Sequence, residues 1–124
     1  MRVWVAGLAL WAAGLALSGC GTGADQRAVR SVAERFYAAV QHHDGRAACA
    51  LLSQPPPDCA SSMLKLSLHG TRAESAGVYA TSAQVKLDSG DVVFLGWSSD
   101  GWRIDAAGCH VVAGGGPLQC EEQP

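Results

Sequence analysis

Two adjacent histidines and a carboxylate, His42, His43 and Asp44, form the most obvious candidate for metal chemistry in this chain. Imidazole and carboxylate groups are common ligands of divalent metals. Neighbouring residues on a helix point about 100° apart, which prevents two adjacent imidazoles from easily facing one ion. We therefore interpret the pair as an exposed helix end, with Asp44 capping the next helix. We expect no metal and no cofactor.

Cysteines are the second group of residues that could do chemistry. Cys109, His110 and Cys120 would form a metal site, but the closely spaced cysteine pairs typical of such sites are missing. Cys49, Cys59, Cys109 and Cys120 are an even number of cysteines, which indicates disulfides in an exported chain. Four cysteines allow three pairings. We expect the sequential pairing, Cys49–Cys59 and Cys109–Cys120, because it closes two short loops of similar length.

The fifth cysteine, Cys20, ends a Leu-Ser-Gly-Cys segment after Arg2 and an apolar run over residues 3–17. This pattern is typical of a bacterial lipoprotein signal peptide. The run is short for a membrane-spanning helix, which needs about 20 apolar residues. We expect cleavage before Cys20, lipidation of Cys20 and anchoring at the extracytoplasmic face of the cell membrane. The alternatives are an ordinary signal peptide with an incidental cysteine, or an uncleaved anchor.

Length and charge limit the function classes. The 124 residues include 9 basic and 11 acidic side chains, for a net charge of −2. This balance argues against nucleic acid as a partner and against a polybasic contact with anionic lipid. We expect a signal peptide over residues 1–19, a tether over 20–24, one domain over 25–120 and a flexible tail over 121–124.

An apolar stripe with helical spacing follows Asp25, which we expect to be the N-cap of a helix ending near His42. The stripe consists of Val29, Val32, Ala33, Phe36, Tyr37 and Val40. Two shorter helices are expected over residues 46–52 and 59–68, the second capped by Asp58. The prolines at 55–57 separate them, because proline lacks a backbone donor.

After Gly70 the apolar residues recur at every second position, a spacing that predicts strands. We expect strands over residues 75–80, 83–87, 92–97 and 102–106. Polar, glycine-containing turns over 88–91 and 98–101 join the last three strands. Residues 109–113 either extend the last strand or form a short one. The chain is therefore predicted to be α+β, with three N-terminal helices packed on a curved antiparallel sheet of about four strands.

Several segments of the chain match one family pattern. The most specific are Ala-Ala-Cys-Ala-Leu-Leu over residues 47–52 and Gly-Trp-Arg-Ile-Asp-Ala-Ala-Gly-Cys over 101–109, followed by Cys120. Shorter matching segments cover residues 29–37, 43–44, 58–60, 83–85 and 91–95. Together they resemble a family of uncharacterised lipoproteins of high-GC Gram-positive bacteria. Members usually carry Pro-Tyr before the last cysteine, where this chain has Leu118 and Gln119, and they tend to end in a glycine-containing tail.

The resemblance implies a cone-like α+β fold, similar to the nuclear-transport-factor-like scaffold of ketosteroid isomerase and scytalone dehydratase. The cysteine frame of the family matches Cys49, Cys59, Cys109 and Cys120 here. The family implies no established activity.

A cone of this type can hold a pocket between helices and sheet. The candidate lining residues are Phe36, Tyr37, His69, Trp97 and Trp102. An isomerase on such a scaffold needs a buried carboxylate base. The acids map elsewhere, to turns, a strand start and a polar strand face: Asp88, Asp91, Asp100, Glu74 and Asp105. We therefore expect no catalytic residues.

Two functional hypotheses follow. The first is a non-catalytic binding or accessory module of the cell envelope, held to the membrane through Cys20 and able to contact another envelope protein. In that case Trp97 or Trp102 would serve as an aromatic anchor. The second is a carrier of a small apolar ligand, or an isomerase or dehydratase, that uses a cavity in the cone. Burial of Glu74, His69 or Asp105 around such a cavity would favour the second hypothesis.

Overall fold

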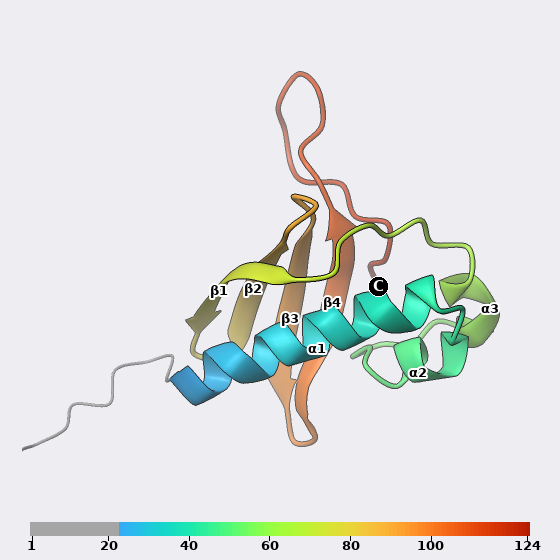
Figure 1. Ribbon diagram of the computed structural model, residues 1–124, viewed down its shortest axis with the longest axis horizontal. Coiled ribbons are helices and arrows are strands. Elements are labelled where there is room, and N and C mark those ends of the chain that lie inside the picture. The colour runs from blue at the N-terminus through green and yellow to red at the C-terminus, as the bar shows by residue number, and fades with distance from the viewer. Residues whose placement is uncertain (1–22) are drawn as a thin grey trace, which may run out of the picture.

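A computed structural model describes residues 23–124 and shows an α+β fold with one antiparallel sheet (Figure 1). The elements in chain order are α1 (Gly23–Gln41), α2 (Gly45–Cys49), α3 (Cys59–Met63), β1 (Ala73–Tyr79), β2 (Ser82–Leu87), β3 (Val92–Ser98) and β4 (Gly101–Cys109). The predicted signal peptide, Cys20 and the first part of the predicted tether lie outside the described residues. Among residues 23–124, none of the helices combines the length and apolar character that a membrane span requires.

Helix α1 runs across one face of the sheet and buries the predicted apolar stripe (Figure 1). The helix begins at Gly23, so Asp25 lies in its first turn and not at the predicted N-cap position. A carboxylate in the first turn suits the positive end of the helix dipole. The helix ends at Gln41, and His43 follows with a positive φ of 58°.

Helices α2 and α3 are each shorter than predicted. Asp44 caps α2 as expected, because its Oδ1 accepts a hydrogen bond from the backbone N–H of Ala47 at 3.0 Å. Asp58 precedes α3 but its side chain makes no capping hydrogen bond, which corrects the second predicted cap. Its left-handed backbone, with φ of 53°, differs from the extended conformation usual at an N-cap.

The four strands form a meander in the order β1-β2-β3-β4, and each pairs antiparallel with the next. The predicted turns over residues 88–91 and 98–101 are confirmed, because they join β2 to β3 and β3 to β4. Strand β2 alternates fully between exposed and buried positions. Its apolar side chains face α1, so the core lies between this helix and one face of the sheet.

The two edges of the sheet differ. Beside β4, Leu52 forms a parallel bridge with Ile104, and the Ile104 N–H donates to the carbonyl of Leu51 at 2.8 Å. Farther along β4, Glu122 pairs with Ala107 through backbone hydrogen bonds of 2.9 and 3.1 Å. Within residues 23–124, β1 pairs with β2 alone. The edge at β1 is therefore open, whereas the edge at β4 is covered.

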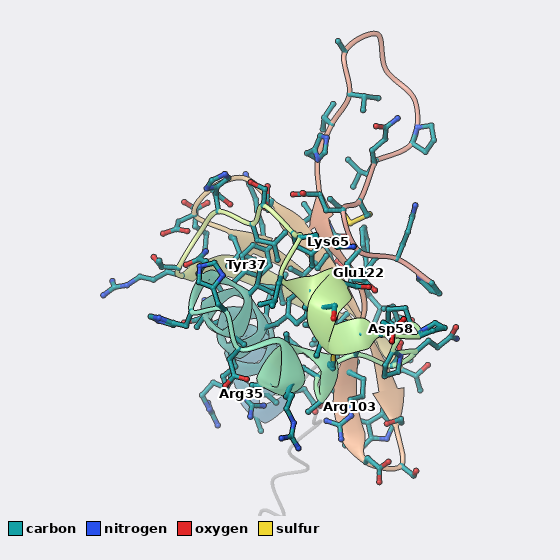
Figure 2. All side chains as sticks on the ribbon, turned by 90° about the vertical axis from the view of Figure 1, so that its right-hand side faces the viewer. Arg35, Tyr37, Asp58, Lys65, Arg103 and Glu122 are labelled. Carbon is teal, nitrogen blue, oxygen red and sulfur yellow. A yellow bond between two sulfur atoms is a disulfide. The ribbon has the colours of Figure 1, made fainter. Side chains whose placement is uncertain are left out.

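The pairing of Glu122 corrects the expectation of a free tail over residues 121–124. The disulfide Cys109–Cys120 returns the chain to the end of β4, so the following residues run antiparallel beside that strand. Residues 110–119 form a loop that projects beyond the sheet, as two perpendicular views show (Figures 1 and 2). The last strand extends beyond its predicted end at residue 106 to Cys109, and His110 forms an isolated antiparallel bridge with Gln119, whereas residues 111–113 form no strand.

Both predicted disulfides are present. Cys49–Cys59 joins the end of α2 to the start of α3 across the proline turn. Cys109–Cys120 closes the projecting loop. A disulfide stabilises a small domain mainly by restricting the unfolded chain. Each bond closes a segment without helix or strand, residues 50–58 and residues 110–119.

Candidate binding surfaces

The most buried polar side chain with a potential chemical role is Tyr37. Its side chain is 0% exposed, and its hydroxyl donates a hydrogen bond to Oδ2 of Asp91 at 3.1 Å. The same hydroxyl accepts a hydrogen bond from the backbone N–H of Gly108 at 3.0 Å. Burial, with the nearby Asp91 carboxylate as a second cause, raises the pKa of Tyr37 well above its ordinary value. The hydroxyl therefore stays protonated at neutral pH.

These contacts give Tyr37 a structural role. A hydroxyl has one proton to donate, and Asp91 receives it. The three residues come from α1, from the turn before β3 and from the end of β4, so the hydroxyl ties three segments together. Sequence reasoning placed Asp91 in a solvated turn and missed this contact. The sequence signal that could have indicated this contact is the position of Asp91, which directly precedes an apolar strand.

The structure does not bring the five predicted pocket residues together. Phe36 and Tyr37 belong to the packed core under α1 and have 0% exposure, which corrects their assignment as pocket lining. His69 is exposed, next to Gly70, and lines none of the three concavities described below. The physical reason is that side chains from α1 and the sheet fill the space between them. Trp97 and Trp102 do lie side by side.

Two of the acids that a catalytic role would need, Glu74 and Asp105, lie in solvent. Glu74 is exposed on β1, and Asp105 is exposed on β4, where its Oδ1 accepts a hydrogen bond from the Ser53 hydroxyl at 2.6 Å. Over residues 23–124, no group of three or more His, Cys, Asp or Glu side chains is arranged to hold a metal ion. His42 and His43 are both exposed at the end of α1.

An aromatic cleft lies where the N-terminal end of α1 meets the sheet. The cleft has a volume of about 260 Å3 and is lined by Asp25, Ala80, Thr81, Trp97 and Trp102. The two indole rings pack edge to face, with centroids 5.5 Å apart and planes at 71°. Edge-to-face packing is a favoured arrangement of aromatic pairs.

The two tryptophans differ in exposure. Trp97 is 54% exposed, whereas Trp102 is 5% exposed. The buried Nε1–H of Trp102 has no hydrogen-bond partner within the part of the chain that the structure describes. A buried N–H group without an acceptor is uncommon in proteins. The cleft thus combines an exposed aromatic ring with a donor that lacks an acceptor.

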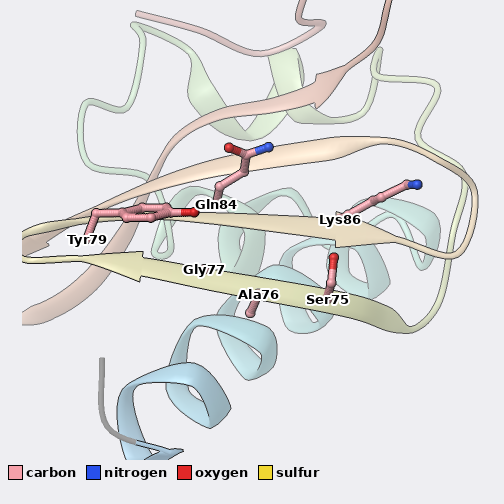
Figure 3. Close-up of a pocket in the computed structure, with 6 residues that line it drawn as sticks. All are labelled: Ser75, Ala76, Gly77, Tyr79, Gln84 and Lys86. Carbon is pink, nitrogen blue, oxygen red and sulfur yellow. The ribbon is translucent and has the colours of Figure 1, made fainter. Parts of the chain in front are cut away.

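A second concavity, also of about 260 Å3, lies on the side of β1 and β2 that faces away from α1. Figure 3 shows Ser75 and Gln84 on this side, with the ring of Tyr79 lying along the strands, while Ala76 points toward the helix. Lys86 completes the polar lining. This surface borders the open edge of the sheet and offers both hydrogen-bond donors and acceptors.

A third concavity, of about 380 Å3, lies on the solvent side of α1. Its lining residues are Arg27, Arg30, Ser31, Glu34 and Arg35. Arg30 also reaches β1, where its Nη1 donates a hydrogen bond to the carbonyl of Ala73 at 3.3 Å. Charged side chains on the outer face of an amphipathic helix are usual, so this region gives no sign of a specific ligand.

Comparisons of the chain with protein-family models, with curated proteins and with solved structures found no match.

Proposed function

We propose that this chain is a lipoprotein of the cell envelope, anchored through Cys20 at the extracytoplasmic face of the membrane, and that it acts as a non-catalytic binding or accessory module. Two disulfides support an extracellular location, because such bonds persist in oxidising compartments. Membership in the lipoprotein family with the cone-like fold is part of the proposal, and the matching cysteine frame supports it.

One observation favours a binding module over an acid–base enzyme. The three side chains that the sequence offered as acid or base, Glu74, His69 and Asp105, are all exposed and line none of the three concavities. Asp25, the acid that lines the aromatic cleft, is only half-buried. A general base works in a desolvated site within hydrogen-bond reach of the substrate. The buried hydroxyl of Tyr37 is already engaged with Asp91 and Gly108.

The surface that best suits a protein partner is the open edge at β1 together with the polar concavity beside it. An exposed sheet edge can accept an added strand through backbone hydrogen bonds, and neighbouring side chains then supply specificity. Gln84 and Lys86 line the concavity next to that edge. We therefore place the partner on this side of the domain.

The experiment has two parts. Cells that produce the wild-type chain or Cys20→Ala are fractionated, and we expect only the wild-type chain in the membrane fraction with an acylated N-terminal cysteine. A photo-crosslinking residue is then placed at Gln84, with Arg35 on the outer face of α1 as the matched control. A specific adduct at Gln84 alone supports the module. Membrane retention of Cys20→Ala, or equal crosslinking at both positions, contradicts it.

The aromatic cleft favours a second candidate, a carrier of a small apolar ligand or an isomerase or dehydratase. Ligand pockets usually have volumes of about 300–1,000 Å3 and enclose most of the ligand, and the cleft is smaller, with about 260 Å3. Titration with a hydrophobic fluorophore tests this candidate. Saturable binding at one site, lost in Trp97→Ala and retained in Tyr79→Ala, would replace the binding-module proposal.

A further inference from the structure

We propose that the tryptophan end of the domain, defined by Asp25, Ala80, Thr81, Trp97 and Trp102, rests on the outer surface of the lipid bilayer, with the Trp97 ring at the level of the lipid headgroups. This inference deepens the proposed function, since it rests on the lipidation of Cys20.

The first support is the length of chain between the anchor and the domain. Helix α1 begins at Gly23, and two residues, Gly21 and Thr22, separate it from Cys20. A chain spans at most about 3.3–3.6 Å per residue, so this segment reaches about 10 Å. Asp25, in the first turn of α1, lines the same cleft as Trp97. The tryptophan end must therefore lie close to the membrane surface.

The second support is the position of Trp97 on the sheet. Val93 and Leu95 lie on the face of β3 that α1 covers, and both are buried. Trp97 continues this row by the period-two rule, yet it is 54% exposed. The apolar face of the sheet thus extends to the place where the helical cover begins. The lipid surface would cover the remaining part.

The third support is chemical. Tryptophan is enriched at membrane–water interfaces because it combines an apolar ring system with a polar N–H. Trp97 offers such a ring, because it is 54% exposed, whereas the Nε1–H of Trp102 is buried and out of reach of lipid. The polar part of a phospholipid supplies ester and phosphate oxygens, which are acceptors. The exposed indole of Trp97 therefore matches the chemistry of the headgroup layer.

Charge determines what kind of contact this is. Asp25 lines the cleft, and Asp100 lies in the turn that joins the two tryptophan-bearing strands. Arg27 also lies at this end, with its guanidinium beside Gly23. Two carboxylates and one guanidinium do not form the lysine and arginine cluster that drives electrostatic membrane binding. We therefore expect the contact to depend on the lipid anchor and to be insensitive to salt.

The tryptophans of the lipidated chain serve as fluorescent probes. Removal of residues 1–19 leaves two of the four tryptophans, Trp97 and Trp102. The purified lipoprotein is placed in vesicles of phosphatidylcholine and phosphatidylglycerol, either plain or with acyl chains brominated near the glycerol. Emission is recorded for wild type and for Trp97→Phe, which keeps only the buried Trp102. The difference between them reports Trp97 and does not require a Trp102 variant to fold.

We expect brominated lipid to quench the Trp97 signal and the emission to shift to the blue. We also expect lower accessibility to acrylamide than in a soluble chain of residues 21–124, at low and at high salt. The signal that remains in Trp97→Phe should respond weakly to both quenchers.

The outcomes separate the two proposals. If mass spectrometry finds no acyl group on Cys20, the proposed function and this inference both fail. If Cys20 is acylated and Trp97 remains as accessible to acrylamide as in the soluble chain of residues 21–124, only the inference is overturned. Protection of Trp97 by soluble cell-wall glycan fragments, without quenching by brominated lipid, would also overturn it and assign the cleft to a saccharide.

Discussion

Tyr37 and Asp91 are 54 positions apart in the sequence, and the hydroxyl of the first donates a hydrogen bond to Oδ2 of the second at 3.1 Å. The bond joins the buried face of α1 to the turn that precedes β3. Because the Gly108 N–H donates to the same hydroxyl, one side-chain oxygen also fixes the end of β4. The packing of the helix on the sheet therefore depends on a polar contact as well as on apolar burial.

Replacement of Tyr37 by Phe should destabilise the domain by about 1–3 kcal/mol, because it leaves the Gly108 N–H and part of the Asp91 carboxylate without a partner. The free energy of unfolding from urea titration is the measurement. Tyr79→Phe removes an exposed hydroxyl and should change the stability by less than about 0.5 kcal/mol. Equal effects of the two substitutions would contradict the role of Tyr37.

The raised pKa of Tyr37 predicts a loss of stability in alkali. Burial and the Asp91 carboxylate raise this pKa in the folded chain above its ordinary value of 10.0. A folded-state pKa above the unfolded one gives stability that is fully present below about pH 10 and is lost as the pH rises through the folded value. Melting temperature measured from neutral pH upward should fall above about pH 10. That fall should be shallower in Tyr37→Phe and unchanged in Tyr79→Phe.

Gly45 marks a close approach between α2 and α3. A Cβ atom at this position would overlap the backbone carbonyl of Ala60. Overpacking of a buried contact typically costs about 1–3 kcal/mol, and we expect Gly45→Ala to lower the free energy of unfolding by that amount. Arg46→Ala, an exposed change on the same helix, is the control. A Gly45→Ala chain as stable as wild type would show that the two helices can separate at little cost.

The two disulfides should contribute similarly to stability, because their cysteines are separated by 10 and 11 positions. Loss of either bond, by paired cysteine-to-alanine substitution, should cost roughly 2–4 kcal/mol. Thermal unfolding gives the size of the effect, and peptide mapping without reductant gives the connectivity. A peptide that links Cys49 to Cys109 or Cys120 would refute the pairing.

The lowered pKa of Asp88 predicts a loss of stability at acid pH. Hydrogen bonds from the backbone N–H of Thr71, at 2.8 Å, and from its hydroxyl, at 3.1 Å, lower the pKa of this carboxyl. A folded-state pKa below the ordinary value, about 3.9, gives stability that is present above that value and is lost as the pH falls through the folded one. In Asp88→Asn, the decline of melting temperature below about pH 4 should be shallower. An unchanged acid decline would show that the carboxyl contributes nothing to it.

Local patterns in the sequence predicted the elements in which apolar residues recur at a regular spacing. The apolar stripe from Val29 to Val40 defined the buried face of α1, and the polar turns at 88–91 and 98–101 defined two hairpins. These predictions succeed because the spacing of apolar residues and the chemistry of turns are local properties. The α+β class and the four-stranded antiparallel sheet followed from them.

Contacts between distant segments could not be predicted in the same way. The partner of Tyr37 depends on where the turn before β3 lies relative to α1. The spacing of apolar residues within each segment does not reveal that placement. Likewise, alternation places Trp97 on the inner face, but its exposure depends on where the helix begins. The pairing of Glu122 with Ala107 depends on how the disulfide Cys109–Cys120 redirects the chain.

The projecting loop over residues 110–119 offers a practical position for labelling the protein in living cells. Gly114, Gly115 and Gly116 all have positive φ, and a Cβ atom on any of them would meet nothing within 4 Å. The disulfide Cys109–Cys120 holds the base of the loop, so an inserted epitope or fluorophore would leave the sheet undisturbed. Because the loop leaves β4 at the end opposite to Trp102, the proposed membrane orientation predicts that a label there stands away from the bilayer and is open to antibody on intact cells.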